Sequence, residues 1–332
     1  MGSKISNIEF VLAKKELDNN YFKDKFPDYD FEKFEKKVGI KKRYICEENE
    51  STLTLAVSAV NKLLKKTPTL RSEIDFIILC TQSPEFPLPT TACIVQEKCN
   101  LKTSIGALDI NLGCSGYTYG ISLAKGLIES GQSKKVLLVT SETYSKYINK
   151  EDLINQLIFG DAASATIIEY SKENKIGNSV FGTDGSGFDK LIVRNNFFNK
   201  QDNPEQKKYS GKNIYTDNNL FMDGSCVFNF TLERIPSLLN QVLQKNNLSD
   251  DDIDQYILHQ ANKFLLKNVI RKSNLDMSKL FFELENNGNT VSSSIPIALY
   301  SYLKDKKSRK LENILLAGFG VGLSWSGITI KI

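Results

Sequence analysis

The chain has 332 residues, of which 41% are apolar and 25% charged, enough to bury one large core or two fused cores of half that size. The formal net charge is only +4, and this balance argues against nucleic acid as a partner. Charged residues interrupt every apolar run well before the roughly 18 residues that a membrane span needs, so we expect no membrane insertion.

The first half of the chain is expected to alternate helices and strands. Apolar residues recur at helical spacing over 51–66, and this amphipathic run leads into a strand at 75–80. A strand at 106–113 then runs into Cys114 and a helix that ends near Ser130, and an apolar strand follows at 135–141. Buried strands that alternate with helices predict parallel pairing with helical cover on both faces.

The second half repeats this order of elements. Its expected elements are a helix at 228–245, a strand at 254–259, a strand at 280–288, a helix from Asn289 to about Lys304 and a strand at 313–318. The repeat predicts two fused α/β halves, 1–172 and 173–332, related by a pseudo-twofold axis. The segment from about 170 to 226 is poor in pattern, which predicts a loop-rich insertion beside the site.

Cysteine and histidine usage excludes several kinds of site. The six cysteines contain no C-x-x-C pair, so neither a disulfide framework nor a zinc site is indicated, and we expect a reducing cytoplasm. His259 is the single histidine, which excludes His-rich metal sites and leaves one candidate for imidazole chemistry.

Cys114 stands where a helix terminus can activate a thiol. It lies within Asn111-Leu-Gly-Cys-Ser-Gly-Tyr-Thr-Tyr-Gly120, so a tight turn after a buried strand places it at a helix N-terminus. Such placement lowers a cysteine pKa from about 8.5 into the range of about 3.5 to 7.5, and the same unpaired N–H groups can hold an oxyanion. The simpler alternative is an inert buried cysteine.

Two amide or imidazole donors follow strand ends in the second half. His259, in Tyr256-Ile-Leu-His-Gln-Ala-Asn262, can donate an N–H to a carbonyl oxygen, and Asn289 can present an uncharged N–H₂ to the same oxygen. A structural histidine and an Asn-Gly turn are the alternatives for each residue alone. Because the carboxyl ends of strands meet at the junction of a duplicated sheet, we expect both residues to converge with Cys114.

Together these segments resemble the β-ketoacyl-acyl-carrier-protein synthase III family of thiolase-fold condensing enzymes. The three segments are Gly-Cys-Ser-Gly-Tyr-Thr-Tyr at Cys114, His-Gln-Ala-Asn at His259, and Gly-Asn-Thr-Val-Ser-Ser-Ser-Ile-Pro at Asn289. Further matches over nearly the whole chain are Gly39-Ile40 with Arg43, Leu88-Pro89, Ala92-Cys93, Ile158-Phe-Gly-Asp161, and Gly318-Phe-Gly-Val-Gly322 with Trp325. The resemblance implies an α/β fold, the five-layered αβαβα thiolase sandwich, acting as a homodimer.

The resemblance also implies a reaction and a set of roles. Cys114 would accept an acyl group from an acyl thioester, and His259 with Asn289 would stabilise the enolate formed by decarboxylation of malonyl-acyl-carrier protein, giving a 3-oxoacyl-acyl-carrier protein for fatty acid biosynthesis. The backbone N–H groups of Cys114 and Val321 would form the oxyanion hole. Leu88, reaching in from the neighbouring subunit, and Phe159 would line the acyl pocket. No metal or redox cofactor is required.

The chain departs from the family where coenzyme A is bound. Lys33 replaces an adenine-stacking Trp, Leu153 and Phe264 replace basic residues, and Lys37 replaces an Arg, which weakens the case for tightly held coenzyme A. The acyl donor, coenzyme A or carrier protein, therefore stays open.

A basic helix face follows His259. Its cations recur at helical spacing, with one adjacent, and are Lys263, Lys267, Arg271 and Lys272. An acidic carrier protein can dock there, and an ordinary solvated face is the alternative.

Other functions are left open by the sequence. The same acyl-enzyme can pass its acyl group to an amine or alcohol in a specialised pathway, such as that of a surface glycan. Type III polyketide synthases and hydroxymethylglutaryl-CoA synthases share the fold, but their flanking motifs fit less well. A nicotinamide oxidoreductase is disfavoured because neither Gly182-Thr-Asp-Gly-Ser-Gly187 nor Gly318-Phe-Gly-Val-Gly322 is a strand-linked dinucleotide motif. A non-catalytic subunit would usually lack the nucleophile, which is present.

Overall fold

The computed structural model describes residues 2–195, 199–209, 213–305 and 312–332. The strands are β1 (Gly2–Leu12), β2 (Lys15–Asp18), β3 (Lys42–Ile45), β4 (Phe76–Cys80), β5 (Gly106–Ile110), β6 (Lys135–Glu142), β7 (Ala162–Ser171), β8 (Val180–Thr183), β9 (Leu191–Val193), β10 (Lys207–Tyr209), β11 (Asn213–Tyr215), β12 (Leu220–Met222), β13 (Gln255–Leu258), β14 (Asn313–Gly320) and β15 (Ser324–Lys331). The α-helices are α1 (Phe31–Val38), α2 (Thr52–Lys66), α3 (Thr91–Lys98), α4 (Gly116–Glu129), α5 (Leu153–Ile158), α6 (Gly224–Lys245), α7 (Lys263–Ser273) and α8 (Ser294–Asp305). Short 3₁₀ helices are η1 (Asn19–Phe22), η2 (Arg71–Glu73), η3 (Tyr144–Tyr147), η4 (Gly185–Lys190), η5 (Met277–Lys279) and η6 (Val291–Ser293).

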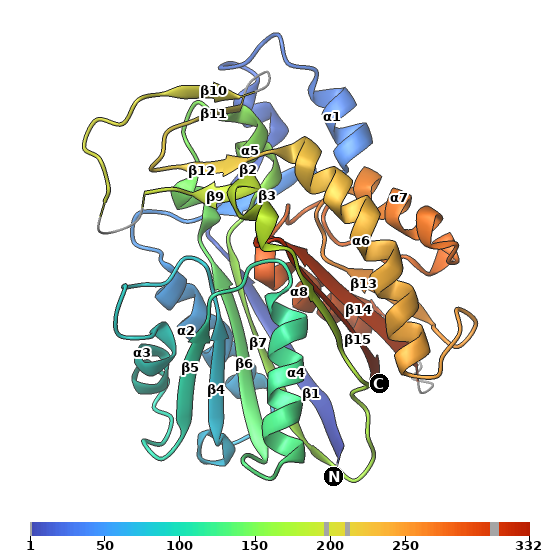
Figure 1. Ribbon diagram of the computed structural model, residues 1–332. Coiled ribbons are helices and arrows are strands. Elements are labelled where there is room, and N and C mark those ends of the chain that lie inside the picture. Colours follow the sequence, from blue (N-terminus) through green and yellow to red (C-terminus); the bar gives the residue numbers. More distant parts are fainter. Residues whose placement is uncertain (1, 196–198, 210–212, 306–311) are drawn as a thin grey trace.

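Two β-sheets form the framework. The first has the strand order β1-β7-β6-β4-β5, and the second has the order β13-β14-β15-β8. Figure 1 shows α2 and α3 on the outer side of the first sheet and α6 and α7 on the outer side of the second. Residues of α4 and α8 share one apolar core with both sheets, so these two helices form the central layer.

Alternate side chains of each strand pack against different helix layers. In β4, Ile77 and Leu79 pack with α2 and α3, whereas Ile78 faces the central layer. In β14, Leu315 packs with α6 and α7, whereas Leu316 faces the central layer. Burial on both faces explains why these strands are almost wholly apolar. The layers follow the order αβαβα, which confirms the expected fold.

Parallel pairing lies toward one edge of each sheet. β4 pairs in parallel with β5 and β6, and β13 pairs in parallel with β14. β6 and β14 each have an antiparallel partner, β7 and β15. The strands expected at 75–80, 106–113, 135–141, 254–259 and 313–318 are thus paired in parallel, as predicted, and β7 and β15 are additional antiparallel strands. β15 follows β14 after a turn at 321–323, too short for the crossover that parallel strands require.

The internal repeat is visible in the strand orders. β1, β7, β6 and β4 of the first sheet correspond, in that order, to β8, β15, β14 and β13 of the second, and β5 of the first sheet has no counterpart.

The strand expected at 280–288 does not form. This segment makes only a single bridge, from Leu280 to Tyr256. The Gln260 side chain accepts a hydrogen bond from Glu283 N (2.8 Å), where a neighbouring strand would otherwise pair.

We propose 1–172 and 173–332 as the two halves, since β7, the last strand of the first sheet along the chain, ends at Ser171.

The segment between the halves is irregular, as expected, but it also contains short strands. β8 forms the edge of the second sheet, and β9 to β12 form two small two-stranded sheets, β12-β9 and β10-β11. Figure 1 shows these small sheets above the ends of β4, β6 and β7. Residues 196–198 and 210–212 of this segment lie outside the described residues.

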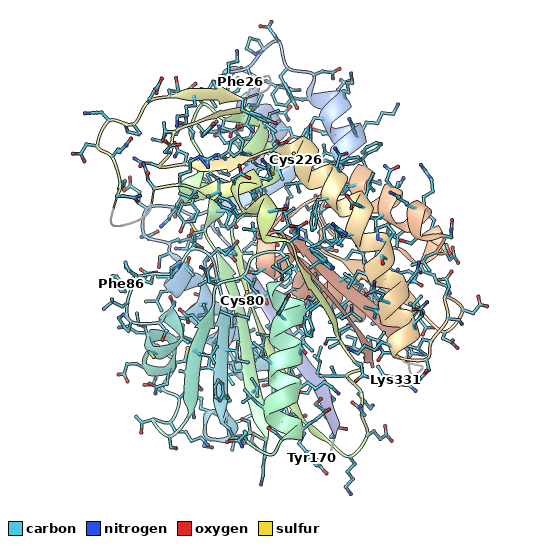
Figure 2. The ribbon with its side chains drawn as sticks, viewed as in Figure 1. Phe26, Cys80, Phe86, Tyr170, Cys226 and Lys331 are labelled. Atoms are coloured by element: carbon cyan, nitrogen blue, oxygen red, sulfur yellow. The ribbon has the colours of Figure 1, made fainter. Side chains whose placement is uncertain are left out.

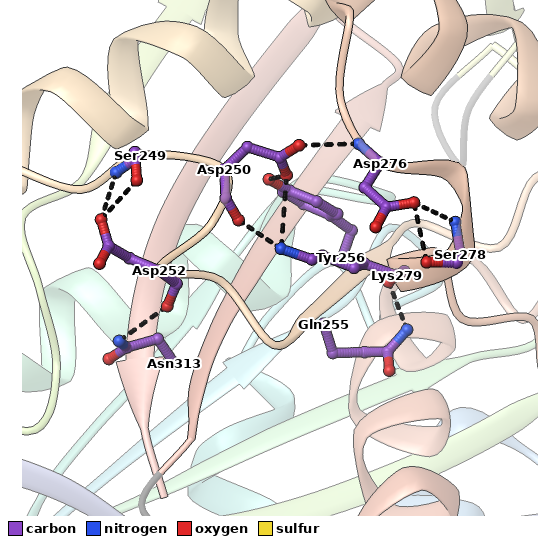
Figure 3. Close-up of polar contacts among 9 residues, drawn as sticks. All are labelled: Ser249, Asp250, Asp252, Gln255, Tyr256, Asp276, Ser278, Lys279 and Asn313. Carbon is purple, nitrogen blue, oxygen red and sulfur yellow. Dashed lines mark hydrogen bonds and ion pairs between the residues drawn. The ribbon is translucent and has the colours of Figure 1, made fainter.

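A polar network fixes the beginning of β13. The Asp250 carboxylate accepts from the Tyr256 hydroxyl (2.6 Å) and from Asp276 N (2.9 Å), while Lys279 Nζ donates to Asp250 O (2.6 Å) (Figure 3). These contacts join the loop before β13 to the turn η5. They hold in place the strand whose other end carries His259.

Candidate active site

Cys114 lies between the two halves of the molecule. It follows β5 and precedes α4, and its side chain is buried, with 5% exposed. A Cβ at Gly320 would lie 2.9 Å from the Cys114 sulfur, and one at Gly318 would lie 2.5 Å from the Cys114 carbonyl oxygen. Glycine at these two positions therefore lets β14 of the second half approach the nucleophile of the first.

His259 extends the same edge of the second sheet. Its backbone N–H donates to Ala317 O (2.8 Å), which continues the pairing of β13 with β14. Its Nδ1 lies 2.7 Å from Ser294 Oγ, and the ring meets Phe319 edge-on, with centroids 5.7 Å apart. Burial lowers the His259 pKa to about 3, partly opposed by the Val291 backbone. The imidazole is therefore neutral at physiological pH.

Asn289 is fixed by its backbone and by its side-chain oxygen. Asn289 N donates to Ile158 O (2.8 Å), and Gly160 N donates to Asn289 O (3.0 Å). The side-chain Oδ1 accepts from Val291 N (2.9 Å), which fixes the orientation of the amide. The NH₂ group is thus left to donate elsewhere.

Val291 brings the three predicted residues together. Its methyl group lies 3.2 Å from a Cβ built on Gly113, which precedes Cys114, its N–H binds Asn289, and its backbone interacts with His259. Val291 has φ +53°, a strained conformation for a β-branched residue. Val291 also shares one apolar cluster with Cys114, and the convergence of Cys114, His259 and Asn289 at the junction of the halves stays a prediction.

The expected depression of the Cys114 pKa is wrong for the free site. Burial, with a contribution from nearby Glu142, raises the pKa of this thiol to about 12, and the backbone N–H groups of Cys114 and Val321 only partly counteract them. The helix α4 begins two residues further on, at Gly116. Desolvation of the sulfur therefore outweighs the helix terminus. Cys114 is therefore a thiol, not a thiolate, at neutral pH.

Glu142, which sequence reasoning missed, is a fully buried carboxyl group at the end of β6. It accepts from Ser292 Oγ (2.8 Å), Ser83 Oγ (3.0 Å) and Gln82 N (3.1 Å). Burial raises its pKa to about 8. The sequence did contain one signal for this group: Glu142 is an acidic residue directly after the apolar strand segment 135–141.

A second thiol lies near the nucleophile. Cys80, at the end of β4, lies inside the molecule (Figure 2), and its Sγ is 2.9 Å from Leu112 O. Burial raises its pKa well above the ordinary value. Cys80 is therefore an inert core residue beside Cys114.

A cavity of about 600 Å³ opens beside Val321 and Tyr144. Its wall combines apolar side chains with polar ones, among them Phe188, Leu191, Val193, Leu220, Gln82, Lys146 and Lys200. Of the two predicted pocket residues, Phe159 is buried in one apolar cluster with Cys114 and Tyr144. Leu88 is 79% exposed and lies on the surface of this single chain.

A second cavity, of about 470 Å³, lies between α1 and the beginnings of α6 and α7. Phe264 stacks on Phe228 (centroids 5.8 Å apart), and Lys37 Nζ lies 5.0 Å from the centroid of the Phe264 ring. Leu153 is wholly buried and cannot meet a ligand from solvent. The two rings contact each other and Lys37, but Phe264 is still 42% exposed, so part of this aromatic surface stays accessible at the cavity.

The basic residues of α7 project from the opposite side of its buried face. Leu265, Leu266, Val269 and Ile270 pack into the core, while Lys267, Arg271 and Lys272 are exposed. Lys263 is half-buried, with Nζ 5.7 Å from the centroid of the Phe282 ring. The helix is capped by Asn262 Oδ1, which accepts from Leu265 N (2.7 Å).

Neither a metal site nor a membrane-spanning helix can be recognised in the described part of the chain. It contains no group of three or more His, Cys, Asp or Glu side chains that could hold a metal ion. None of its helices is long and apolar enough to cross a membrane.

Comparisons with known proteins give a consistent result. Family models described as 3-oxoacyl-[acyl-carrier-protein] synthase III and its C-terminal part match residues 108–185 and 243–332. Beta-ketoacyl-[acyl-carrier-protein] synthase III of Clostridioides difficile is 34% identical over 98% of this chain and 97% of its own length. The enzyme of that name from Clostridium perfringens is 35% identical over 97% of each chain.

Solved structures agree with the sequence relatives. A crystal structure of 3-oxoacyl-(acyl-carrier-protein) synthase III superimposes with a TM-score of 0.96, 38% identity and complete coverage of both chains. The 3-oxoacyl-(acyl-carrier protein) synthase of Burkholderia xenovorans gives a TM-score of 0.92 and 33% identity, covering 100% of this chain and 94% of that one. This chain therefore belongs to the 3-oxoacyl-[acyl-carrier-protein] synthase III family.

Proposed function

We propose that the protein condenses an acyl thioester with malonyl-acyl-carrier protein, releasing carbon dioxide and forming a 3-oxoacyl-acyl-carrier protein. The observation that supports this proposal is the set of contacts made by Val291 with Asn289, with His259 and with Gly113, the residue before Cys114. A thiol, a neutral imidazole and a carboxamide supply a nucleophile and two uncharged donors. The membership of the chain in the synthase III family supports the same reaction.

In the first half-reaction the Cys114 sulfur attacks the carbonyl carbon of the acyl thioester. The thiol proton leaves with the departing donor thiol, and the acyl group stays on Cys114. The tetrahedral oxyanion would be received by the backbone N–H groups of Cys114 and Val321, both of which lie close enough to the sulfur to lower its pKa. This pair is the proposed oxyanion hole.

In the second half-reaction His259 and Asn289 act on the malonyl thioester. Their N–H groups would donate to its carbonyl oxygen, so that the negative charge left by departing carbon dioxide gathers on a stabilised enolate. The enolate carbon attacks the acyl group, and the Cys114 sulfur leaves. Because the His259 pKa is about 3, a neutral donor fits this role better than a general base does.

We propose that the acidic carrier protein docks on α7. Lys267, Arg271 and Lys272 are exposed there, and Lys263 lies at the end of the helix nearest His259. Charge reversal at Lys267 and Arg271 should raise the apparent KM for the carrier substrate, since exposed charges act mainly on encounter with the partner. An unchanged KM would refute docking on this helix.

We also propose a homodimer in the cytoplasm. Exposure of Leu88, with 79% of its surface accessible, supports its burial in the acyl pocket of a second subunit, next to Phe159. All six cysteines are unpaired, and a nucleophilic thiol keeps its activity in a reducing compartment.

The products distinguish condensation from transfer to an amine or alcohol. With malonyl-carrier protein present, condensation releases carbon dioxide and lengthens the acyl chain by two carbons. Mass spectrometry of the carrier-bound product, after incubation with a panel of acyl-CoA and acyl-carrier donors, should detect that product. Transfer of the intact acyl group to an amine or alcohol, without loss of carbon dioxide, would contradict the proposal.

A further inference from the structure

The buried carboxyl group of Glu142 has no role in the reaction described above. Glu142 ends β6, is fully buried, and binds Ser83 and Gln82 beyond the end of β4. Its other oxygen accepts from Ser292 Oγ (2.8 Å), in the turn that follows Asn289. One side chain thus joins two strand ends of the first half to the Asn289 turn of the second.

Within the described part of the chain, Glu142 is bound by uncharged hydroxyl and backbone N–H groups, and no cation forms an ion pair with it. Among the described residues, the titratable groups that act on it or respond to it are Cys80, Cys114, Tyr144, Tyr147 and Asp161. Each of these is either neutral or negative. A buried charge without a partner is costly, so the carboxyl group is held in its neutral form at neutral pH.

Neutral Glu142 matters for the nucleophile. A negative charge at this position opposes formation of the Cys114 thiolate, as the effect of Glu142 on the Cys114 pKa indicates. A protonated carboxyl group keeps its hydrogen bonds without adding that charge. It can accept from Gln82 N and donate one O–H toward a serine oxygen.

We propose that Glu142 is a positioning residue of the condensation: its neutral carboxyl group holds the Asn289 turn against the strand ends beside Cys114 and leaves the sulfur free of a neighbouring negative charge. This inference rests on the proposed function. It assigns the carboxyl group no contact with substrate.

The charge part of the proposal is tested without any substrate. Glu142→Gln is a matched replacement, because an amide offers one acceptor and donors in place of the neutral carboxyl group. The rate of alkylation of Cys114 by iodoacetamide is followed against pH by mass spectrometry of the Cys114 peptide. The variant should match the unmodified protein near neutral pH and exceed it several-fold above the Glu142 pKa of about 8.

Glu50→Gln provides the control for this experiment. Glu50 is also buried, but it binds the N–H groups of Lys14 and Glu47 and does not act on Cys114. Its alkylation profile should coincide with that of the unmodified protein. Coincident profiles for Glu142→Gln and the unmodified protein across the whole pH range would overturn the proposal. Because alkylation needs no acyl donor, this reading is independent of whether condensation occurs.

The positioning part is tested by Ser292→Ala, which removes the link to the turn and keeps the carboxyl group. Decarboxylation of malonyl-carrier protein should slow by about tenfold, the loss expected for one hydrogen bond that orders a donor, while acylation of Cys114 proceeds at its usual rate. Equal slowing of both half-reactions, or of neither, would contradict positioning of Asn289. Failure of the unmodified protein to condense any donor would instead contradict the proposed function.

Discussion

At the scale of single residues, the site relies on neutral groups whose side chains are buried. His259 has a pKa lowered to about 3 and Glu142 a pKa raised to about 8, so both are largely uncharged near pH 7. Donors fixed in a water-excluded pocket stabilise a developing enolate more strongly than donors in water do. Removing either proposed donor, His259 or Asn289, should therefore slow the decarboxylation step selectively.

The first prediction concerns these two donors. His259→Ala and Asn289→Ala should each slow decarboxylation of malonyl-carrier protein by about 10² to 10³, the usual effect of one lost donor. Acylation of Cys114 should continue in both variants. Because His259 titrates at about pH 3, the step should not weaken through its protonation between about pH 7 and pH 5. Rates of carbon dioxide release measured against pH check both statements.

A second prediction concerns the glycine beside the nucleophile. In Gly320→Ala the new Cβ would lie 2.9 Å from the Cys114 sulfur, closer than real Cβ contacts come, so the sulfur must shift and acylation should slow by at least about tenfold. Gly126→Ala on α4 is the matched control, since its Cβ would meet nothing within 4 Å. That variant should keep its activity and gain about 0.5–1 kcal/mol of stability. An unchanged rate of acylation in Gly320→Ala would contradict the position of the Cys114 sulfur beside Gly320.

The residue scale also shows where sequence reasoning stops. The candidates Cys114, His259 and Asn289 could be picked out because each lies in a distinctive motif, and Cys114 and His259 also follow strands that form as expected. The pKa of Cys114 was not, because desolvation depends on how completely distant segments cover the sulfur. Glu142 and Ser292 lie 150 residues apart in sequence, and their contact is not encoded in a local pattern.

At the scale of elements, the strands that carry the site are fixed at both ends. β13 begins beside the Asp250 network of Figure 3 and ends directly before His259, which is bound to Ser294. The almost wholly apolar strands, buried on both faces, were predictable from the sequence. The segment after Leu280 was not, because the side chain of Gln260 replaces a strand partner there.

A third prediction concerns the beginning of β13. Tyr256→Phe removes the hydroxyl group that donates to Asp250 (2.6 Å) and should lower the free energy of unfolding by about 1.5–3 kcal/mol, as expected for a bond to a charged acceptor. Tyr170→Phe, at a tyrosine that is 46% exposed, should change it by less than about 0.5 kcal/mol. Urea unfolding measures both. Equal stability of the two variants would contradict a structural role for the network.

At the scale of the whole molecule, the repeat in the sequence becomes a repeat in strand order. The order β1-β7-β6-β4 corresponds to β8-β15-β14-β13, so the site forms where equivalent strand ends from the two halves meet. This arrangement was predictable, because it needs only the order of elements and the rule for strand ends. The small sheets between the halves were not, because their strands are only three residues long.

A fourth prediction concerns the dependence of stability on pH. The Glu142 pKa is raised from 4.5 to about 8 in the folded chain, so the folded state binds the proton more tightly than the unfolded state does. The contribution of this group is therefore fully present below about pH 4.5 and is lost as the pH rises through about 8. Glu142→Gln should unfold with a weaker pH dependence over this interval, measured by urea titration at several pH values. An unchanged dependence would contradict burial of an ionisable Glu142.

The central claim is that the sulfur of Cys114 carries the acyl group within reach of donors from the other half of the chain. It is tested most directly by adding a radioactive acyl thioester to the unmodified protein and to Cys114→Ala, and then adding malonyl-carrier protein. The unmodified protein should take up one label per chain and release it as carrier-bound product, and Cys114→Ala should remain unlabelled. Rapid labelling of Cys114→Ala, or label that stays on Cys114 after malonyl-carrier protein is added, would contradict this account.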